Sequence, residues 1–334
     1  MDLFELAGKL IDIESTTGNE NRIAFFLRDY LSGLGYRVSM QEAAPDRFNV
    51  QAFPGQPLVI FTTHLDTVPP FIPFREDEQY IYGRGACDAK GIMAAQIEAA
   101  ERLRADGEDR FGLLFVVGEE RNSAGALLAN RNPPGSKYYI DGEPTGNRLA
   151  LASKGSLRVE VIAHGRSAHS AYPEQGESAI LKLIDVLQDI RNMDLPSDTE
   201  FGDSTCNIGV IEGGTKPNVI PDFARAEVMF RSVEPVEMLK ERLTTAVAGR
   251  CEVQHRFEVP IVRMGVIPGF ETTVVSFASD VPFLDRWGKP FLVGPGSILD
   301  AHTDHERLSK QELLAGADLY VRLARRLLAG EGSS

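Results

Sequence analysis

The chain has few cysteines and no long apolar run. Its three cysteines, Cys87, Cys206 and Cys251, lie far apart among 334 residues, which suits a reducing compartment better than a disulfide framework. No apolar run approaches the roughly 20 residues of a membrane-spanning helix. Residues 1–5 carry acids and lack the basic region that begins a signal peptide. We therefore expect a cytoplasmic protein that does not enter a membrane.

Basic residues are also scarce. The chain has 35 lysines and arginines against 48 aspartates and glutamates, a formal net charge of −13. Such a protein is not expected to bind nucleic acid or an anionic membrane through its charge. Carboxylates gathered as metal ligands are one source of an acidic excess. Hydrophobic residues make up 43 % of the chain, enough for a globular core, and the length predicts two domains.

Strands and helices alternate over residues 1–155, which predicts an α/β fold with a mainly parallel, helix-covered sheet. The segment 111–117 is apolar throughout and is typical of a strand buried on both faces. The apolar spacing predicts elements in this order: helices at 3–11 and 19–34, the second closed by Gly35, strands at 36–41, 48–53 and 58–63, a helix at 92–104, and strands at 111–117 and 137–140.

The pattern changes near residue 155. Residues 156–263 read β-α-β-β-α-β, which predicts an open-faced sandwich inserted into the first domain as a second one. Its first strand, 157–162, alternates and is expected to be half exposed. Residues 264–334 return to the first domain and end in a helix, which Ser309 and Glu312 begin with a capping box. One face of this helix is expected to be apolar, lined by Leu313, Leu314, Ala317, Val321, Ala324 and Leu328.

A candidate site begins at the end of the strand 58–63. His64 and Asp66 are two residues apart there, so their side chains point the same way. Other acids and histidines also fall at strand ends or in loops. Because ligands bind at the carboxyl ends of the strands in open α/β sheets, we expect these groups to converge. They are Asp88, Glu119, Glu120, Glu143 and His302.

The mixture of imidazoles and carboxylates favours zinc, cobalt or manganese over calcium or magnesium. The number of ligands suits two metal ions. One ion would be held by His64 and Glu143, the other by Glu120 and His302, with Asp88 bridging them. A pair of ions about 3.5–4 Å apart activates a water and polarises a carbonyl together.

Two acids are left over. Glu119 adjoins a ligand and suits a general base, while Asp66 is placed to accept the second N–H of the imidazole. Each motif alone also has an ordinary structural interpretation. Asp88 can cap the helix that follows it, Glu143 can lie in a plain turn, and residues 305–306 are expected to form a solvated loop. Their joint occurrence at predicted strand ends favours the metal site.

Five of these motifs in this order resemble those of a known family, the dinuclear zinc amidohydrolases. That family includes acetylornithine deacetylase, succinyl-diaminopimelate desuccinylase, aminoacylase and glutamate carboxypeptidase. The resemblance implies zinc ligands at His64, Asp88, Glu120, Glu143 and His302, with Glu119 as general base and Asp66 as partner of His64. It is carried by His64-Leu65-Asp66-Thr67-Val68-Pro69, Gly83-Arg84-Gly85-Ala86-Cys87-Asp88-Ala89-Lys90-Gly91, Gly118-Glu119-Glu120, Gly142-Glu143-Pro144-Thr145 and Ala301-His302.

The inserted domain resembles that family's lid and dimerisation domain. The segment 165–170 is similar to a lid segment whose histidine, here His169, stabilises the oxyanion across a homodimer interface. The segment 213–221, which contains Asn218, is similar to a substrate-contacting loop. Arg231 falls where the family holds a substrate α-carboxylate, a role that suits a guanidinium fork.

The resemblance predicts an enzyme that hydrolyses the amide bond of an N-acyl amino acid, as a deacetylase or desuccinylase does in amino-acid biosynthesis. A carboxypeptidase or dipeptidase acting on short peptides with the same metals is the alternative. An inactive metal-binding regulatory module is a third interpretation, and the presence of both Glu119 and Glu120 argues against it. Residue 89 is an alanine where many relatives carry a bulkier residue, so the resemblance does not predict the substrate pocket.

Overall fold

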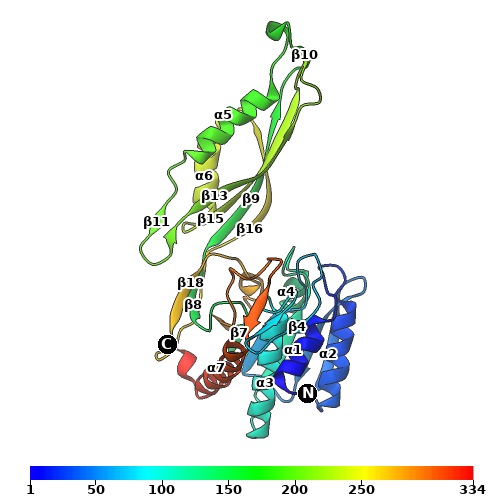
Figure 1. Ribbon diagram of the computed structural model, residues 1–334. Coiled ribbons are helices and arrows are strands. Elements are labelled where there is room, and N and C mark those ends of the chain that lie inside the picture. The colour runs from blue at the N-terminus through cyan, green and yellow to red at the C-terminus, as the bar shows by residue number, and fades with distance from the viewer. Residues whose placement is uncertain (334) are drawn as a thin grey trace. The chain divides into compact units, whose positions relative to one another are not determined.

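The computed structural model describes residues 1–333 and divides into two compact units. Unit 1 comprises residues 1–151, 264–273 and 279–334, and unit 2 comprises residues 152–263 and 274–278 (Figure 1). Within residues 1–333, none of the helices combines the length and the apolar composition that crossing a membrane requires.

Unit 1 is built around a mixed six-stranded sheet with the order β1-β2-β6-β3-β7-β19. The four strands β6, β3, β7 and β19 are parallel, and β2 and β1 extend the sheet in antiparallel pairing. The mainly parallel sheet predicted from the sequence is confirmed. The strands are β1 Arg37–Ala44, β2 Arg47–Phe53, β3 Val59–His64, β6 Phe111–Val116, β7 Tyr138–Asp141 and β19 Lys289–Leu292.

Helices cover this sheet and bury apolar side chains against it, and the alanine-rich α3 is buried on most of its sides. Helices α3 and α7 pack against β3 and against each other, and Phe61 on β3 meets Tyr320 on α7 edge to face. A short sheet with the order β20-β5-β4 lies in the same unit. The elements are α1 Leu3–Ile11, α2 Asn21–Gly33, α3 Lys90–Ala105, α4 Ala124–Ala129, α7 Lys310–Leu328, β4 Arg75–Glu76, β5 Tyr80–Tyr82 and β20 Arg307–Ser309.

Unit 2 carries four long antiparallel strands with the order β13-β15-β9-β16 and two helices. Their sequence order, β9-α5-β13-β15-α6-β16, confirms the predicted sandwich. Strands β8 and β18, which begin in residues assigned to unit 1 and end in residues assigned to unit 2, form a three-stranded sheet with the order β17-β8-β18. The elements are β9 Gly155–His164, α5 Ala179–Arg191, β13 Thr205–Gly213, β15 Phe223–Ser232, α6 Val236–Val247, β16 Glu252–Val259, and the short β8 Leu149–Ser153, β10 Ala168–His169, β11 Ser197–Asp198, β12 Gly202–Asp203, β14 Val219–Ile220, β17 Val262–Arg263 and β18 Thr272–Val275.

The prediction that residues 157–162 are half exposed is wrong. Strand β9 lies between β15 and β16, and only Arg158 and His164 along it are exposed. Glu160 is buried because Arg225 and Arg256, on the two flanking strands, both donate to its carboxylate. An ion-pair cluster thus covers a sheet face that the alternation assigned to solvent.

Helix α7 departs from its prediction at two residues. Ser309 does cap it by accepting the Glu312 N–H, but the Glu312 carboxylate accepts from the Gly296 N–H instead of closing a capping box. Leu313 and Leu323 are fully buried, whereas Leu314 is 43 % exposed. Leu314 therefore lies off the apolar face to which the sequence assigned it.

Replacing Leu323 by alanine tests how much this helix contributes to the core. Leu323→Ala leaves a cavity among fully buried side chains and is expected to lower the free energy of unfolding by about 2–5 kcal/mol. Leu314→Ala, on the same helix, is the matched control and is expected to change it by less than about 0.5 kcal/mol. Urea unfolding followed by circular dichroism measures both, and equal losses would contradict the packing described.

Candidate metal centre

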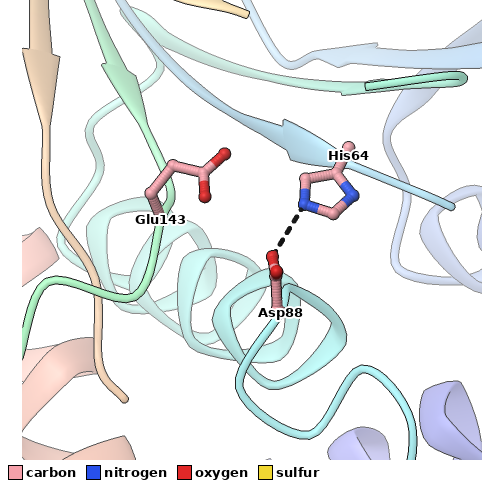
Figure 2. A group of neighbouring side chains, drawn as sticks. All are labelled: His64, Asp88 and Glu143. Carbon is pink, nitrogen blue, oxygen red and sulfur yellow. Dashed lines mark hydrogen bonds and ion pairs between the residues drawn. The ribbon is translucent and has the colours of Figure 1, made fainter. Parts of the chain in front are cut away.

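The first group of candidate ligands combines His64, Asp88 and Glu143. His64 ends β3, Glu143 follows β7, and Asp88 lies in the turn before α3. All three are buried, and one ligand atom of each lies within 4.8 Å of the others. Figure 2 shows the three side chains pointing toward one another, with His64 Nε2 at 3.0 Å from Asp88 Oδ1. Neighbouring parallel strands thus deliver two of these groups to one sheet edge.

A second group combines Asp88, Glu120 and His302, again within 4.8 Å of one another. His302 Nε2 lies 3.2 Å from Asp88 Oδ2 and 3.0 Å from Glu120 Oε1. Asp88 belongs to both groups and turns one oxygen to each histidine. The alternative in which Asp88 caps the next helix is wrong, because α3 has Ala89 at its N-cap and no side-chain cap.

The charges of these groups suit bound cations. Hydrogen bonds that the carboxylates of Asp88 and Glu120 accept from its imidazole raise the pKa of His302 to about 10. Burial lowers the pKa of His64, but its hydrogen bond to Asp88 and the charges of nearby acids leave it well above its usual value. The neighbouring carboxylates therefore favour a positive charge at both imidazoles, the positions that a metal cation would take. With neutral histidines, the carboxylates of Asp88, Glu120 and Glu143 give the two groups an excess of negative charge, which divalent cations would balance.

Glu119 belongs to neither ligand group. Burial raises the pKa of its carboxyl well above the usual range, and the charges of Asp280, Glu120 and Asp88 add to the rise while His64 opposes it. A carboxyl whose pKa is raised above the usual range and that lies next to a candidate ligand is suited to general acid–base work.

Asp66 contacts His64 in another way than predicted. The imidazole Nδ1 lies 2.8 Å from the backbone oxygen of Asp66 and 3.7 Å from its carboxylate. The carboxylate instead accepts from the backbone N–H groups of Gly118, Glu119 and Glu120, at 2.9, 3.1 and 3.3 Å. Asp66 therefore orients the imidazole through its main chain and fixes the loop of Glu119 and Glu120 through its side chain.

Glu306 was expected in a solvated loop, and that prediction is wrong. Its neighbour His305 is exposed, but Glu306 is 2 % exposed. Burial and the charge of Asp88 raise the pKa of Glu306, while the buried Arg84 at 2.7 Å opposes the rise. No local sequence signal distinguishes a buried glutamate in a loop from an exposed one, so this group could not be found from the pattern.

A pair of buried acids near His64 was also missed. Burial raises the pKa of both Asp141 and Asp280 to about 7, and the charge of Asp141 adds to the rise at Asp280. Among residues 1–333, neither oxygen of Asp280 has a well-formed hydrogen bond, although the Ser123 hydroxyl faces it. Asp141 ends β7 two residues before Glu143, so its place at a strand end was a usable signal. Asp280 had none.

Unit 2 brings two of its three candidate residues together. His169 on β10 pairs with Val219 on β14, and the Ser170 N–H donates to the Asn218 carbonyl at 3.0 Å. Arg231 lies near the other end of β15, opposite Ser156 on β9. The eight steps along β15 from residue 223 to residue 231 span about 26 Å, so one copy of unit 2 does not place Arg231 beside His169.

The α/β fold and the two overlapping clusters of histidines and carboxylates define a metal-dependent hydrolase. A family model described as a peptidase dimerisation domain matches residues 151–255. A peptidase M20 domain-containing protein of Schizosaccharomyces pombe is 38 % identical over 96 % of this chain and 84 % of its own length. A protein of Aspergillus clavatus named a probable carboxypeptidase is also 38 % identical, over 96 % of this chain and 81 % of its own. The chain belongs to the M20 peptidase family.

Solved structures share the fold. A tripeptidase from Staphylococcus aureus superposes with a TM-score of 0.81 at 23 % identity, covering 97 % of this chain and 98 % of that one. An M20 family metallo-carboxypeptidase from Sulfolobus solfataricus does so with a TM-score of 0.78 at 15 % identity, covering 96 % and 98 %. The resemblance to the dinuclear metallohydrolases and the predicted fold class are thereby confirmed, and the chain is a hydrolytic metalloenzyme.

Replacing Asp280 by asparagine tests the buried acid pair. The unfolded chain releases the Asp280 proton near pH 4, whereas the folded protein keeps it up to about pH 7. Folding therefore binds a proton over this range, and the free energy of unfolding falls as the pH rises from 4 to 7. Asp280→Asn removes this loss and is expected to stabilise the protein more at pH 8 than at pH 5, by about 2–3 kcal/mol.

Chemical denaturation of chelator-treated protein at the two pH values measures the effect. Asp185→Asn, on the exposed face of α5, controls for the loss of one negative charge and should show no such difference. An Asp280→Asn effect that is the same at pH 5 and pH 8 would contradict the raised pKa.

Proposed function

We propose that the protein hydrolyses an amide bond whose amine product is an amino acid with a free α-carboxylate. The observation that supports this most is the pair of ligand groups that share Asp88, with Glu119 beside them. His64, Asp88 and Glu143 would hold one zinc ion, and Asp88, Glu120 and His302 a second, with cobalt or manganese also fitting these donors. Two such ions, when bound, polarise the amide carbonyl and acidify a water.

The residues of the chain handle the protons. Glu119 takes a proton from the attacking water as general base, and the same carboxyl then gives it to the nitrogen of the departing amine. Asp66 keeps Glu119 in place because it accepts the N–H groups of the loop. The backbone oxygen of Asp66 accepts the Nδ1–H of His64 and leaves Nε2 as the ligand atom.

Substrate recognition is assigned to unit 2. Arg231 is suited to bind the α-carboxylate as a fork, His169 to stabilise the oxyanion, and Asn218 to hold the amino-acid end. Since one copy holds Arg231 far from the other two, we assign His169 and Asn218 to the site of a second copy in a homodimer. In this scheme residues 156–263 form the inserted lid and dimerisation domain between catalytic parts 1–155 and 264–334.

Two substrate classes fit this site. An N-acyl amino acid, such as an acetylornithine-like compound, and a short peptide with a free carboxyl end present the same scissile amide and the same carboxylate. The names of the fungal relatives, probable carboxypeptidases, favour the peptide. The three cysteines are free, which suits action in the cytoplasm.

Amine release from a panel of N-acetyl, N-succinyl and N-aminoacyl amino acids tests the function. The panel is run with zinc- or cobalt-loaded protein and with a chelated control. Chelator-sensitive release from acetyl or succinyl compounds would select the deacylase, and release from peptides alone would select the peptidase. Amidated peptides, which lack the α-carboxylate, should be poor substrates. Absence of amine release from every compound of the panel would contradict the proposal.

Glu119→Gln tests the general base. The amide has nearly the size of the carboxylate but accepts no proton, so kcat is expected to fall by about 10²–10⁴-fold. Two metal ions per chain should still bind, because Glu119 lies outside both ligand groups. Metal analysis and steady-state kinetics measure the two quantities. Full activity in Glu119→Gln would overturn the assignment, whereas Glu143→Gln should lose metal as well as activity.

Mixing two inactive variants tests whether a site is shared between copies. His169→Ala and Arg231→Ala are each expected to be nearly inactive. After subunit exchange, half of the dimers are mixed, and each mixed dimer has one intact site, so about a quarter of wild-type activity should return. A mixture of His169→Ala with Asn218→Ala is the matched control and should return none, since both residues belong to the same copy. Sites built within one chain would give no recovery in either mixture.

A further inference from the structure

Glu306 makes contacts that reach the candidate metal centre although it is not one of the candidate ligands. Its Oε1 accepts from the backbone N–H groups of Gly85, Cys87 and Asp88, at 2.9, 3.2 and 3.1 Å. Its Oε2 accepts from Nη1 of Arg84 at 2.7 Å. One buried carboxylate thereby fixes the direction of three amides in a single turn, and the last of them belongs to the residue shared by both ligand groups.

The same short segment also carries a candidate ligand. His302 precedes Glu306 by four residues, and Arg84 donates to the Thr303 carbonyl at 3.2 Å. The Gly83 N–H donates to the backbone oxygen of Glu306, and β20, which begins at the next residue, pairs with β5. Segments 80–88 and 302–309, more than 200 residues apart in the chain, are therefore joined side by side.

The turn has little freedom once these bonds form. Lys90 is fully buried against Gly85, and its Nζ donates to the Ile13 carbonyl at 2.6 Å. Glu306 then holds the backbone of Asp88 by accepting its N–H, and the two carboxylate oxygens of Asp88 point to His64 and His302. A small rotation of this turn would move both oxygens at once, because they share one carboxyl group.

We propose that Glu306 is a positioning residue of the metal centre, which holds the turn 84–88 so that Asp88 presents one oxygen to each metal position. The inference rests on the dinuclear site of the proposed function. It goes beyond that site because it assigns the geometry of the shared ligand to a residue that touches neither metal position. Residues that orient metal ligands typically contribute about 10- to 100-fold to metal affinity.

Glu306→Gln separates this role from that of a plain buried ion pair. The amide has one oxygen, so it faces either the three N–H groups or Arg84, and its NH₂ group then opposes donors on the other side. Metal-free protein is titrated with cobalt(II) while the visible absorption of bound cobalt is recorded. We expect Glu306→Gln to bind both equivalents about 10- to 100-fold more weakly than the wild type and to reach the two-metal spectrum only at correspondingly higher cobalt.

Glu160→Gln is the matched control, since Glu160 is also buried and paired with two arginines but lies in unit 2. It should bind both equivalents as the wild type does. Glu306→Gln that is folded by circular dichroism and binds two cobalt ions with wild-type affinity would overturn the proposal, as would an equal weakening in Glu160→Gln.

Glu306→Asp decides the question if the glutamine variant does not fold. It keeps the charge that pairs with Arg84 but withdraws the carboxylate by about 1.5 Å, one carbon–carbon bond, from the three amides. Weak cobalt binding in folded Glu306→Asp supports the proposal, and wild-type binding overturns it. No substrate enters these titrations, so an inactive panel of substrates would count against the proposed reaction and not against Glu306. A wild type that binds fewer than two ions would count against the dinuclear site itself.

Discussion

Repulsion between buried carboxylates is the constraint on which the rest of this structure depends. Asp88, Glu120 and Glu143 meet at one sheet edge with Glu119 beside them, and Asp141 and Asp280 lie close behind. Burial raises the pKa values of Glu119, Glu143 and Asp280 above their usual range, and the charges of neighbouring carboxylates add to the rise because like charges in a medium of low dielectric oppose one another. Such an arrangement persists only where the surrounding backbone holds each group in place and cations or protons balance the charge.

The chain supports the arrangement with two other carboxylates, each of which accepts three backbone N–H groups. Asp66 holds the loop 118–120, and Glu306 holds the turn 84–88. Peptide dipoles stabilise a buried negative charge without adding positive charge that would compete with a metal. The two carboxylates come from distant parts of the chain, so the site edge is closed only when the segments after β3 and before β20 have both docked.

Much of the fold follows from local pattern. The apolar strands β3 and β6 and the inserted β-α-β-β-α-β unit could be predicted because the spacing of apolar residues over such lengths distinguishes strands from helices. The grouping of His64, Asp88, Glu120, Glu143 and His302 was readable because strand ends share an edge, and the structure brings these side chains together. Their role as metal ligands stays a prediction.

What the pattern could not supply were contacts between segments far apart in sequence. Glu160 alternates like an exposed residue, yet arginines from two other strands bury it. Glu312 has the spacing of a capping box, yet its carboxylate accepts a hydrogen bond from the Gly296 N–H instead. Glu306 and Asp280 lie in loops, where burial depends on distant partners. In each case a polar side chain was placed by a tertiary partner that local sequence does not name.

The length of β15 has a consequence for behaviour in the cell. If, as proposed, a site takes Arg231 from one copy and His169 from another, it exists only in the associated protein, and dilution would remove whole sites and not merely slow them. Below the dissociation constant of the dimer, the rate per volume then varies with the square of the protein concentration. Expression level would act as a threshold on output, and freshly made chains would stay latent until they find a partner.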